Sequence, residues 1–171
     1  MLPHRIPLAA LTPAAFAPYG AVITSAGRDG RDINAGTTLR VDMPEPDILS
    51  HGGRPSLSVF RARPGSLPFE VKMMERHRLG SQTFVPMMGT PFVVMVALGA
   101  TAPDMATLKA FRADGGAGIT LGPDVWHHPL LALAAGDFVV LERKGEEVDC
   151  EIFDMPAGMW LVDEPVIAAA Q

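Results

Sequence analysis

Residues 69–82 read Phe69-Glu-Val-Lys-Met-Met-Glu-Arg-His-Arg-Leu-Gly-Ser-Gln82, and the alternation in this stretch indicates the fold class. In a β-strand, side chains two positions apart project from the same face. One face of a strand over 69–77 would therefore carry Phe69, Val71, Met73, Glu75 and His77. This face changes from apolar to ionisable at its end, and a turn at Leu79-Gly80 would bring Gln82 alongside it. The stretch predicts a strand that presents a polar cluster.

The distribution of proline and glycine predicts an all-β protein. Sixteen prolines and seventeen glycines are spread along the chain, which leaves few windows for a helix of about a dozen residues. We expect one short helix over 13–16, capped by Thr12. Further strands are expected over 21–24, 37–43, 56–62, 91–98, 108–112, 118–121, 138–142 and 150–154, with 91–98 and 138–142 buried on both faces. Residues 44–55 should form an exposed connection, and the tail after Pro156 should be a terminal extension that could pack on a partner subunit.

Composition indicates one domain over residues 1–171, because 171 residues with 48% hydrophobic content supply one core and are too few for two ordinary domains. The formal net charge of -5 and the lack of a basic stripe argue against nucleic-acid binding. The longest apolar run, 91–100, is far shorter than the roughly 20 residues of a membrane-spanning helix. A single cysteine, Cys150, permits no internal disulfide, and we expect residues 1–10 to be the mature start rather than a signal peptide. We therefore expect a cytoplasmic protein.

Two segments together resemble the motifs of cupin β-barrels. The second of them reads Gly122-Pro-Asp-Val-Trp-His-His-Pro129. Glu75, His77 and Gln82 have the spacing of the first cupin motif, with Glu for its first histidine and Gln for its usual Glu. His127 takes the histidine position of the second motif. The resemblance implies a cupin-type jelly-roll β-barrel with a few short helices, in which these four side chains point inward.

The resemblance has two departures in the second motif. Asp124 stands where cupins usually have a turn glycine, and Leu131 stands where they have a closing asparagine.

The four inward side chains could bind a divalent ion such as Ni²⁺, Mn²⁺, Zn²⁺ or Fe²⁺, because imidazole nitrogens and oxygen donors suit these metals. A neutral amide is a poor ligand, however, and Glu75, His77 and His127 could instead work as a metal-free acid/base group. Burying Glu75 on an apolar strand face is costly unless it is paired or ligating, so we expect its pKa to be perturbed. The sequence leaves both alternatives open.

Longer phrases resemble one cupin family, ureidoglycolate lyase. These phrases are Leu11-Thr-Pro-x-x-Phe-x-Pro-Tyr-Gly20, Ile33-Asn-x-Gly-x-x-x-Arg40, Glu75-Arg-His-x-Leu-Gly-Ser-Gln-x-Phe-x-Pro86 and Val125-Trp-His-His-Pro129-Leu. They span most of the chain in the family's order. The resemblance implies a homodimeric enzyme of allantoin breakdown, which splits ureidoglycolate into glyoxylate and urea.

The chemistry implied by this resemblance assigns roles to particular residues. Elimination needs a base, for which His77 or Glu75 is the candidate, and a proton donor, for which His127 is the candidate. Arg40 with Asn34 would hold the substrate carboxylate, because the planar guanidinium group binds a carboxylate through two hydrogen bonds.

Some residues near these candidates have competing interpretations. Gln82 and Trp126 are further candidates for substrate binding, although Gln82 could simply bond a strand end and Trp126 could equally belong to the core. Arg76 and Arg78, on the face opposite His77, are expected to be solvated or at a subunit contact. His128 would face away from His127.

Other functions compete with the lyase. A hydrolase that releases ammonia and carbon dioxide could use the same pocket, and a non-catalytic cupin could bind a small hydroxy acid as a sensor. A metal-dependent isomerase or dioxygenase cupin usually has more histidine ligands than the two placed here.

Overall fold

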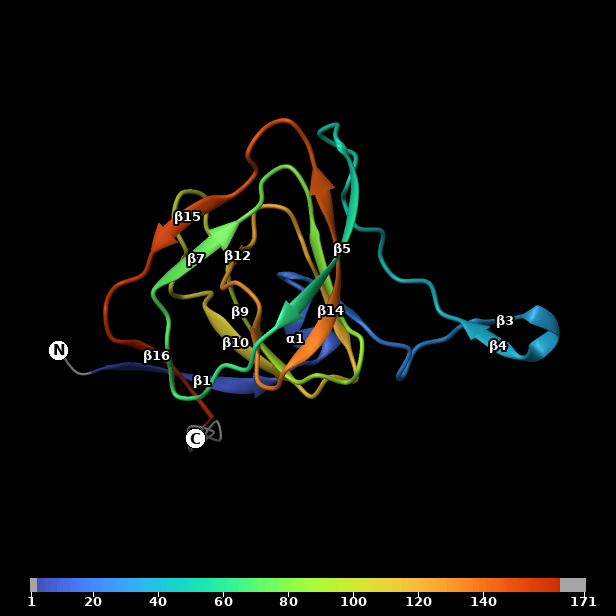
Figure 1. Ribbon diagram of the computed structural model, residues 1–171, viewed down its shortest axis with the longest axis horizontal. Helices are drawn as coiled ribbons and strands as arrows, with labels where there is room; N and C mark the ends of the chain where they lie inside the picture. The colour runs from blue at the N-terminus through green and yellow to red at the C-terminus, as the bar shows by residue number, and fades with distance from the viewer. Residues whose placement is uncertain (1–2, 164–171) are drawn as a thin grey trace.

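A computed structural model describes residues 3–163, which form two β-sheets and a projecting hairpin (Figure 1). Within these residues the larger sheet has nine strands. Their order is β15 (Glu151–Asp154), β7 (Met73–Arg76), β12 (Trp126–His127), β9 (Phe92–Ala97), β10 (Lys109–Ala113), β1 (His4–Ala10), β16 (Met159–Val162) and β6 (Phe69–Glu70), and β13 (Leu131–Ala132) also pairs with β9. The expectation of an all-β, cupin-type fold is confirmed.

The smaller sheet faces the larger one and has five strands within the described residues. In order, they are β2 (Gly20–Ile23), β11 (Gly118–Leu121), β8 (Gln82–Pro86), β14 (Gly136–Lys144) and β5 (Arg54–Ala62). A single-turn helix, α1 (Pro13–Phe16), precedes β2, and the Thr12 hydroxyl accepts a hydrogen bond from the Ala15 amide at 3.2 Å. The predicted helix and its cap are therefore confirmed.

Strand β9 is buried on both faces, as predicted, because each face packs against a different core. The inter-sheet core joins residues of both sheets, among them Phe84, Val94, Val96, Leu121, Phe138 and Val140. The second core lies on the other face of β9 and includes Met74, Val93, Met95, Trp126 and Leu161. These members all lie on strands of the nine-stranded sheet, so this sheet curls around the second core.

The curl explains why a single strand over 69–77 was a wrong prediction. The chain forms β6 over Phe69–Glu70, leaves the sheet, and resumes as β7 over Met73–Arg76. Strand β6 pairs with β16, whereas β7 pairs with β12 and β15 towards the other end of the same sheet. Residues 71 and 72 therefore carry the chain between the two ends of the curled sheet.

The residues after Pro156 were wrongly predicted to be a terminal extension. Residues Met159–Val162 form β16, which pairs in parallel with β1 and antiparallel with β6. The strand supplies the fully buried Leu161 to the second core. The part of the expected extension beyond residue 163 lies outside the described residues.

Two other strand predictions need correction. The strand predicted over 138–142 lies within β14, but only one of its faces is fully buried, because Phe138 and Val140 face the core while their neighbours alternate outward. Of the strand predicted over 37–43, only Thr38–Arg40 forms β4. The predicted exposed connection over 44–55 leads instead into β5, which begins at Arg54.

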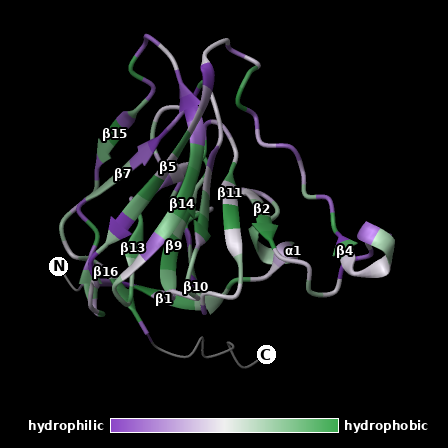
Figure 2. Cartoon of the chain, turned by 45° about the vertical axis from the view of Figure 1, so that its right-hand side comes forward, coloured by the Kyte–Doolittle hydropathy of each residue, from purple (hydrophilic) through white to green (hydrophobic). Residues whose placement is uncertain are grey.

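Strand β4 belongs to a hairpin that stands away from both sheets (Figures 1 and 2). It pairs only with β3 (Arg31–Ile33), and the turn between them, η1 (Asn34–Gly36), has positive φ angles at Asn34 and Ala35. Figure 2 shows hydrophobic residues in the middle of β14 and on part of β11, as expected for strands that pack on a core. No helix among the described residues is long and apolar enough to span a membrane.

Leu161→Ala should lower the free energy of unfolding by about 2–5 kcal/mol, because it leaves a cavity in the second core. Met88→Ala serves as the matched control, since 85% of the Met88 surface is exposed; its effect should be within about 0.5 kcal/mol. Urea denaturation of both variants measures the difference. Equal stabilities would show that β16 does not contribute to the core.

Candidate functional site

Glu75 and His127 lie opposite each other on paired strands and face the space between the sheets. The register pairs Glu75 with His127, and His127 with Val96 of the inter-sheet core. Directly paired residues project to the same face, so both side chains point towards the five-stranded sheet. His127 Nε2 lies 3.6 Å from Glu75 Oε1, which is an ion-pair distance rather than a hydrogen bond.

His77 completes a cluster of three, which we call the triad: Glu75, His77 and His127. Its ring lies 5.4 Å from that of His127, and one ligating atom from each of the three residues lies within 4.8 Å of the others. His77 directly follows β7, and its carbonyl accepts a hydrogen bond from the Asp124 amide at 2.8 Å. This bond ties the two sequence motifs together.

Asp124 adopts a φ of 63°, the left-handed conformation that glycine accepts without strain. Aspartate tolerates this conformation better than most residues. The substitution for the usual cupin glycine therefore leaves the turn intact.

Backbone carbonyls fix the orientation of both imidazole rings. His127 Nδ1 lies 2.9 Å from the Val125 carbonyl oxygen, and His77 Nδ1 bonds to the Asp149 carbonyl oxygen. A carbonyl only accepts, so each Nδ1 donates, and in the neutral ring Nε2 carries a lone pair. Both Nε2 atoms are buried and have no hydrogen-bond partner within residues 3–163.

Three electron-pair donors thus converge in the interior: two imidazole nitrogens and the Glu75 carboxylate. Such an arrangement is costly unless a proton or a metal ion lies between the groups. Proteins commonly hold a divalent ion with a carboxylate and with imidazole rings. In such rings one nitrogen binds the metal and the other donates a hydrogen bond to a carbonyl. The triad could therefore hold such an ion.

The environment of Glu75 shifts its acidity as the sequence analysis expected. Burial raises the pKa of the carboxyl, but the neighbouring imidazoles of His127 and His77 and the Cys150 thiol outweigh burial, so the pKa lies below its ordinary value. A lowered pKa in the folded state means that ionised Glu75 stabilises the fold at neutral pH, and this contribution is lost as pH falls through the lowered pKa.

Gln82 lies on the opposite sheet and faces the same interior. It is at the start of β8, two residues before the core residue Phe84, and its register partner on β11 is the core residue Leu121. Only 6% of Gln82 is exposed. Its Nε2 donates to Glu142 Oε2 at 2.8 Å, whereas its Oε1 is buried without a partner among the described residues.

The structure does not bring Asn34, Arg40 or Trp126 to the triad. Asn34 and Arg40 are on the projecting hairpin, where Arg40 pairs with Asp42 at 2.6 Å. Trp126 points to the opposite face from His127, into the second core, and its Nε1 donates to the Gly99 carbonyl at 3.0 Å.

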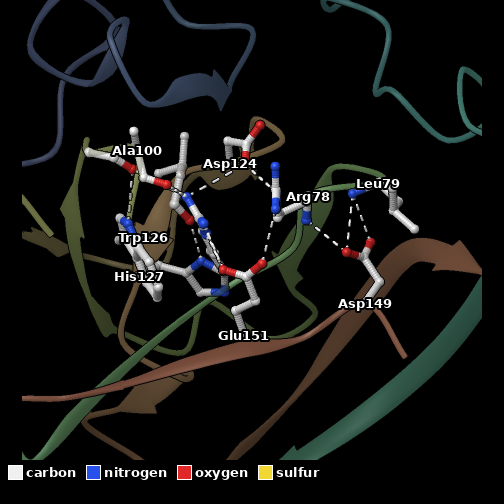
Figure 3. A network of polar contacts seen from close by, with 11 residues as sticks. Arg78, Leu79, Ala100, Asp124, Trp126, His127, Asp149 and Glu151 are labelled. Carbon is white, nitrogen blue, oxygen red and sulfur yellow. Dashed lines mark hydrogen bonds and ion pairs between the residues drawn. The ribbon is translucent and has the colours of Figure 1, made fainter. Parts of the chain in front are cut away.

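Arg76 is buried, and the prediction that it would be solvated or at a subunit contact was wrong. On the neighbouring strand β15, Glu151 is its register partner and forms an ion pair with it at 2.6 Å. Its guanidinium also lies 4.5 Å from the centre of the Trp126 ring. Arg78 is more exposed and lies within 3.3 Å of both Asp124 and Glu151 (Figure 3). Strand alternation predicts the face of Arg76 but not the Trp126 ring and the Glu151 carboxylate that lie against it.

Asp149 is a further site residue that sequence reasoning missed. Its carboxylate accepts hydrogen bonds from the backbone amides of Arg78 and Leu79, at 2.7 Å and 3.0 Å respectively (Figure 3). The Asp149 backbone carbonyl also accepts a hydrogen bond from His77 Nδ1. Asp149 therefore holds the turn that follows β7 through both its side chain and its backbone. Because this contact joins residues 72 apart, no local spacing signals it.

His128 faces away from the triad, as predicted. Its ring packs against Phe69 at 5.2 Å between centroids, and burial lowers its pKa, so it favours the neutral form.

Comparison with known proteins gives one consistent result. The family model described as "Ureidoglycolate lyase" matches residues 3–162. The ureidoglycolate lyase of Burkholderia mallei (strain NCTC 10229) is 43% identical over 160 residues, which cover 92% of this chain and 94% of that protein. That of Burkholderia cepacia is 41% identical over 94% of this chain and 92% of that protein. That of Escherichia coli O1:K1 / APEC is 41% identical over 85% of this chain and 91% of that protein.

Asp149→Ala should lower the free energy of unfolding by about 1–3 kcal/mol, because it removes the acceptor for two backbone amides in the turn after His77. Asp154→Ala, on the exposed edge strand β15, is the matched control and should be near neutral. Urea denaturation measures both values. If the two variants have the same stability, Asp149 does not hold the turn.

Proposed function

This chain belongs to the ureidoglycolate lyase family, and from that premise we propose that its reaction takes place between the two sheets, at Glu75, His77 and His127. The chain is a lyase. The observation that carries the proposed location is the convergence of two unpartnered, buried imidazole nitrogens on one carboxylate.

The reaction requires one proton to move. Ureidoglycolate carries a carboxylate, a hydroxyl and a ureido nitrogen on one carbon. As the carbon–nitrogen bond breaks, the hydroxyl oxygen becomes the aldehyde oxygen of glyoxylate and loses its proton. The departing nitrogen gains a proton and leaves as urea. A base near the hydroxyl and an acid near the nitrogen lower this barrier.

The triad can hold and deliver that proton. Glu75 Oε1 or His77 Nε2 accepts the hydroxyl proton. His127, protonated at Nε2 as well as Nδ1 before the reaction, gives the Nε2 proton to the leaving nitrogen, and the proton taken from the hydroxyl then passes within the triad to restore it. The Nδ1 bonds to Asp149 and Val125 keep both Nε2 atoms turned to the interior, where the proton transfer takes place.

A divalent ion also fits the triad, because three electron-pair donors with no mutual hydrogen bond face one point. Glu75, His77 and His127 would hold the ion, with Gln82 Oε1 as a fourth candidate ligand from the facing sheet. When bound, the ion would attract the substrate carboxylate and hydroxyl and lower the pKa of the hydroxyl.

We propose that Arg40, with Asn34, binds the substrate carboxylate across a homodimer. Both residues are on a hairpin that stands off its own barrel, and an isolated two-stranded hairpin is only marginally stable in water. The hairpin exposes Leu39, and the outer face of β5 exposes Leu57 and Val59. A second copy would cover these apolar surfaces and receive the hairpin near its own site.

The proposed cellular setting follows from the same reaction. Ureidoglycolate belongs to allantoin breakdown, by which purine nitrogen is recovered. The lone cysteine, Cys150, fits a reducing cytoplasm. We propose that residues 1–171 act as one domain, since strands from both ends of the described chain share the nine-stranded sheet.

Incubation of the purified protein with ureidoglycolate should yield glyoxylate and urea in equal amounts. His77→Ala should lower kcat by at least about 100-fold, because it removes one of the groups that handle the proton. His128→Gln, which leaves the triad intact, is the matched control and should retain activity. Ammonia without urea would contradict the lyase reaction and favour the hydrolase.

Loss of turnover on adding a chelator, with recovery on adding Ni²⁺, Mn²⁺, Zn²⁺ or Fe²⁺, would support the bound ion.

Mixing two inactive variants tests whether the hairpin serves the partner's site. In a mixed dimer of His77→Ala and Arg40→Ala chains, one site has an intact triad and receives the intact hairpin of the other chain. Activity should therefore rise on mixing, to a fraction of the wild-type kcat/KM. If each chain uses its own Arg40, the mixture stays inactive, and the cross-subunit role of the hairpin is rejected.

A further inference from the structure

Glu142 is a polar residue on the interior face of β14 that the triad does not use. The register pairs Glu142 with Gln82, and the core residue Val140 lies two positions before it on the same face. Its Oε2 accepts the hydrogen bond from Gln82 Nε2 at 2.8 Å. The two side chains therefore form a polar pair on the interior face of the five-stranded sheet.

This hydrogen bond determines which end of the Gln82 amide is available. A carboxylate only accepts, so Glu142 selects the NH₂ group of Gln82 and turns the carbonyl oxygen away from itself. That oxygen, Oε1, is buried on a side chain that is 6% exposed, and it has no partner within residues 3–163. A buried acceptor without a donor is unfavourable, so the site is suited to a ligand that brings an N–H group.

We propose that Glu142 is a positioning residue that orients Gln82, and that Gln82 Oε1 accepts a hydrogen bond from the ureido N–H groups of the substrate. This inference rests on the proposed function. It adds a direction of binding: the ureido group points to the five-stranded sheet. The substrate carboxylate has no donor and would be repelled by this acceptor and by Glu142, so it lies away from them.

Two ligands of equal shape test this proposal without turnover. Hydantoate carries a carboxylate and a ureido group but lacks the hydroxyl, so it cannot eliminate. Levulinate has the same chain length and carbonyl position, with CH₃ and CH₂ in place of NH₂ and NH. Calorimetric titration should show that the wild-type protein binds hydantoate at least about tenfold more tightly than levulinate, as expected for one buried hydrogen bond.

Glu142→Gln should abolish most of this preference. A glutamine at 142 can donate as well as accept, so it no longer fixes the Gln82 amide. Hydantoate affinity should fall about tenfold while levulinate affinity stays the same. The matched control is Glu146→Gln, at an exposed position just beyond β14, which should keep the wild-type preference. Thermal melting checks that each variant is folded.

A second variant keeps the test valid if Glu142→Gln is unstable. Gln82→Met removes the amide at similar volume and should itself lose the preference for hydantoate. Glu142→Gln should then have no further effect on the preference when added to Gln82→Met, because a positioning residue acts through its partner.

Three results would overturn the proposal. The first is a wild-type protein that shows no preference for hydantoate, or does not bind it. The second is an equal loss of affinity for hydantoate and for levulinate in Glu142→Gln, which would give Glu142 a role in pocket shape only. The third is a loss of Zn²⁺ affinity in Glu142→Gln as large as the loss of hydantoate affinity, which would make Gln82 a metal ligand. A Glu142-dependent preference in a protein that does not cleave ureidoglycolate would reject the proposed reaction and keep this binding mode.

Discussion

The site depends on two hydrogen bonds from imidazole rings to backbone carbonyls. The carbonyls of Asp149 and Val125 each bind Nδ1 of one ring, which turns the Nε2 atoms of His77 and His127 towards Glu75. Neither carbonyl belongs to a side chain, so the orientation is held by the fold itself rather than by a particular neighbouring residue. The result is a buried group of electron-pair donors that needs a proton or a metal ion.

The curl of the nine-stranded sheet supplies the place for this group. Strands β6 and β7 follow each other in sequence but lie at different positions in the sheet, so the chain wraps around the second core between them. On the other face, β7 and β12 present Glu75 and His127 to the five-stranded sheet. Two cores thus fix the two faces of the strands that carry the triad, and packing holds the site rigid.

The two sheets contribute different chemistry to the space between them. The nine-stranded sheet supplies groups that can hold a proton or a divalent ion. The five-stranded sheet supplies the Gln82 amide, held by Glu142. A substrate with a hydroxyl and carboxylate on one side and N–H groups on the other matches this division. In the reaction that we propose, recognition and bond breaking therefore depend on opposite walls of this space.

The sequence by itself determined the β-rich class, the helix capped by Thr12, and the shared face of Glu75 and His77. These follow from local patterns: the spread of proline and glycine, a cap within four residues, and the alternation of strand side chains every two residues. The motif spacing also indicated His127 and Gln82 as site residues. Tertiary structure alone decided that Arg76 is buried against Trp126 and Glu151, that Trp126 belongs to the second core, and that Asp149 and Glu142 support the site. The hydrogen bonds of Arg76 with Glu151, His77 with Asp149 and Gln82 with Glu142 join residues 60 to 75 positions apart. Strand periodicity states which face a side chain takes, but what lies against that face depends on how the sheets curl and pair.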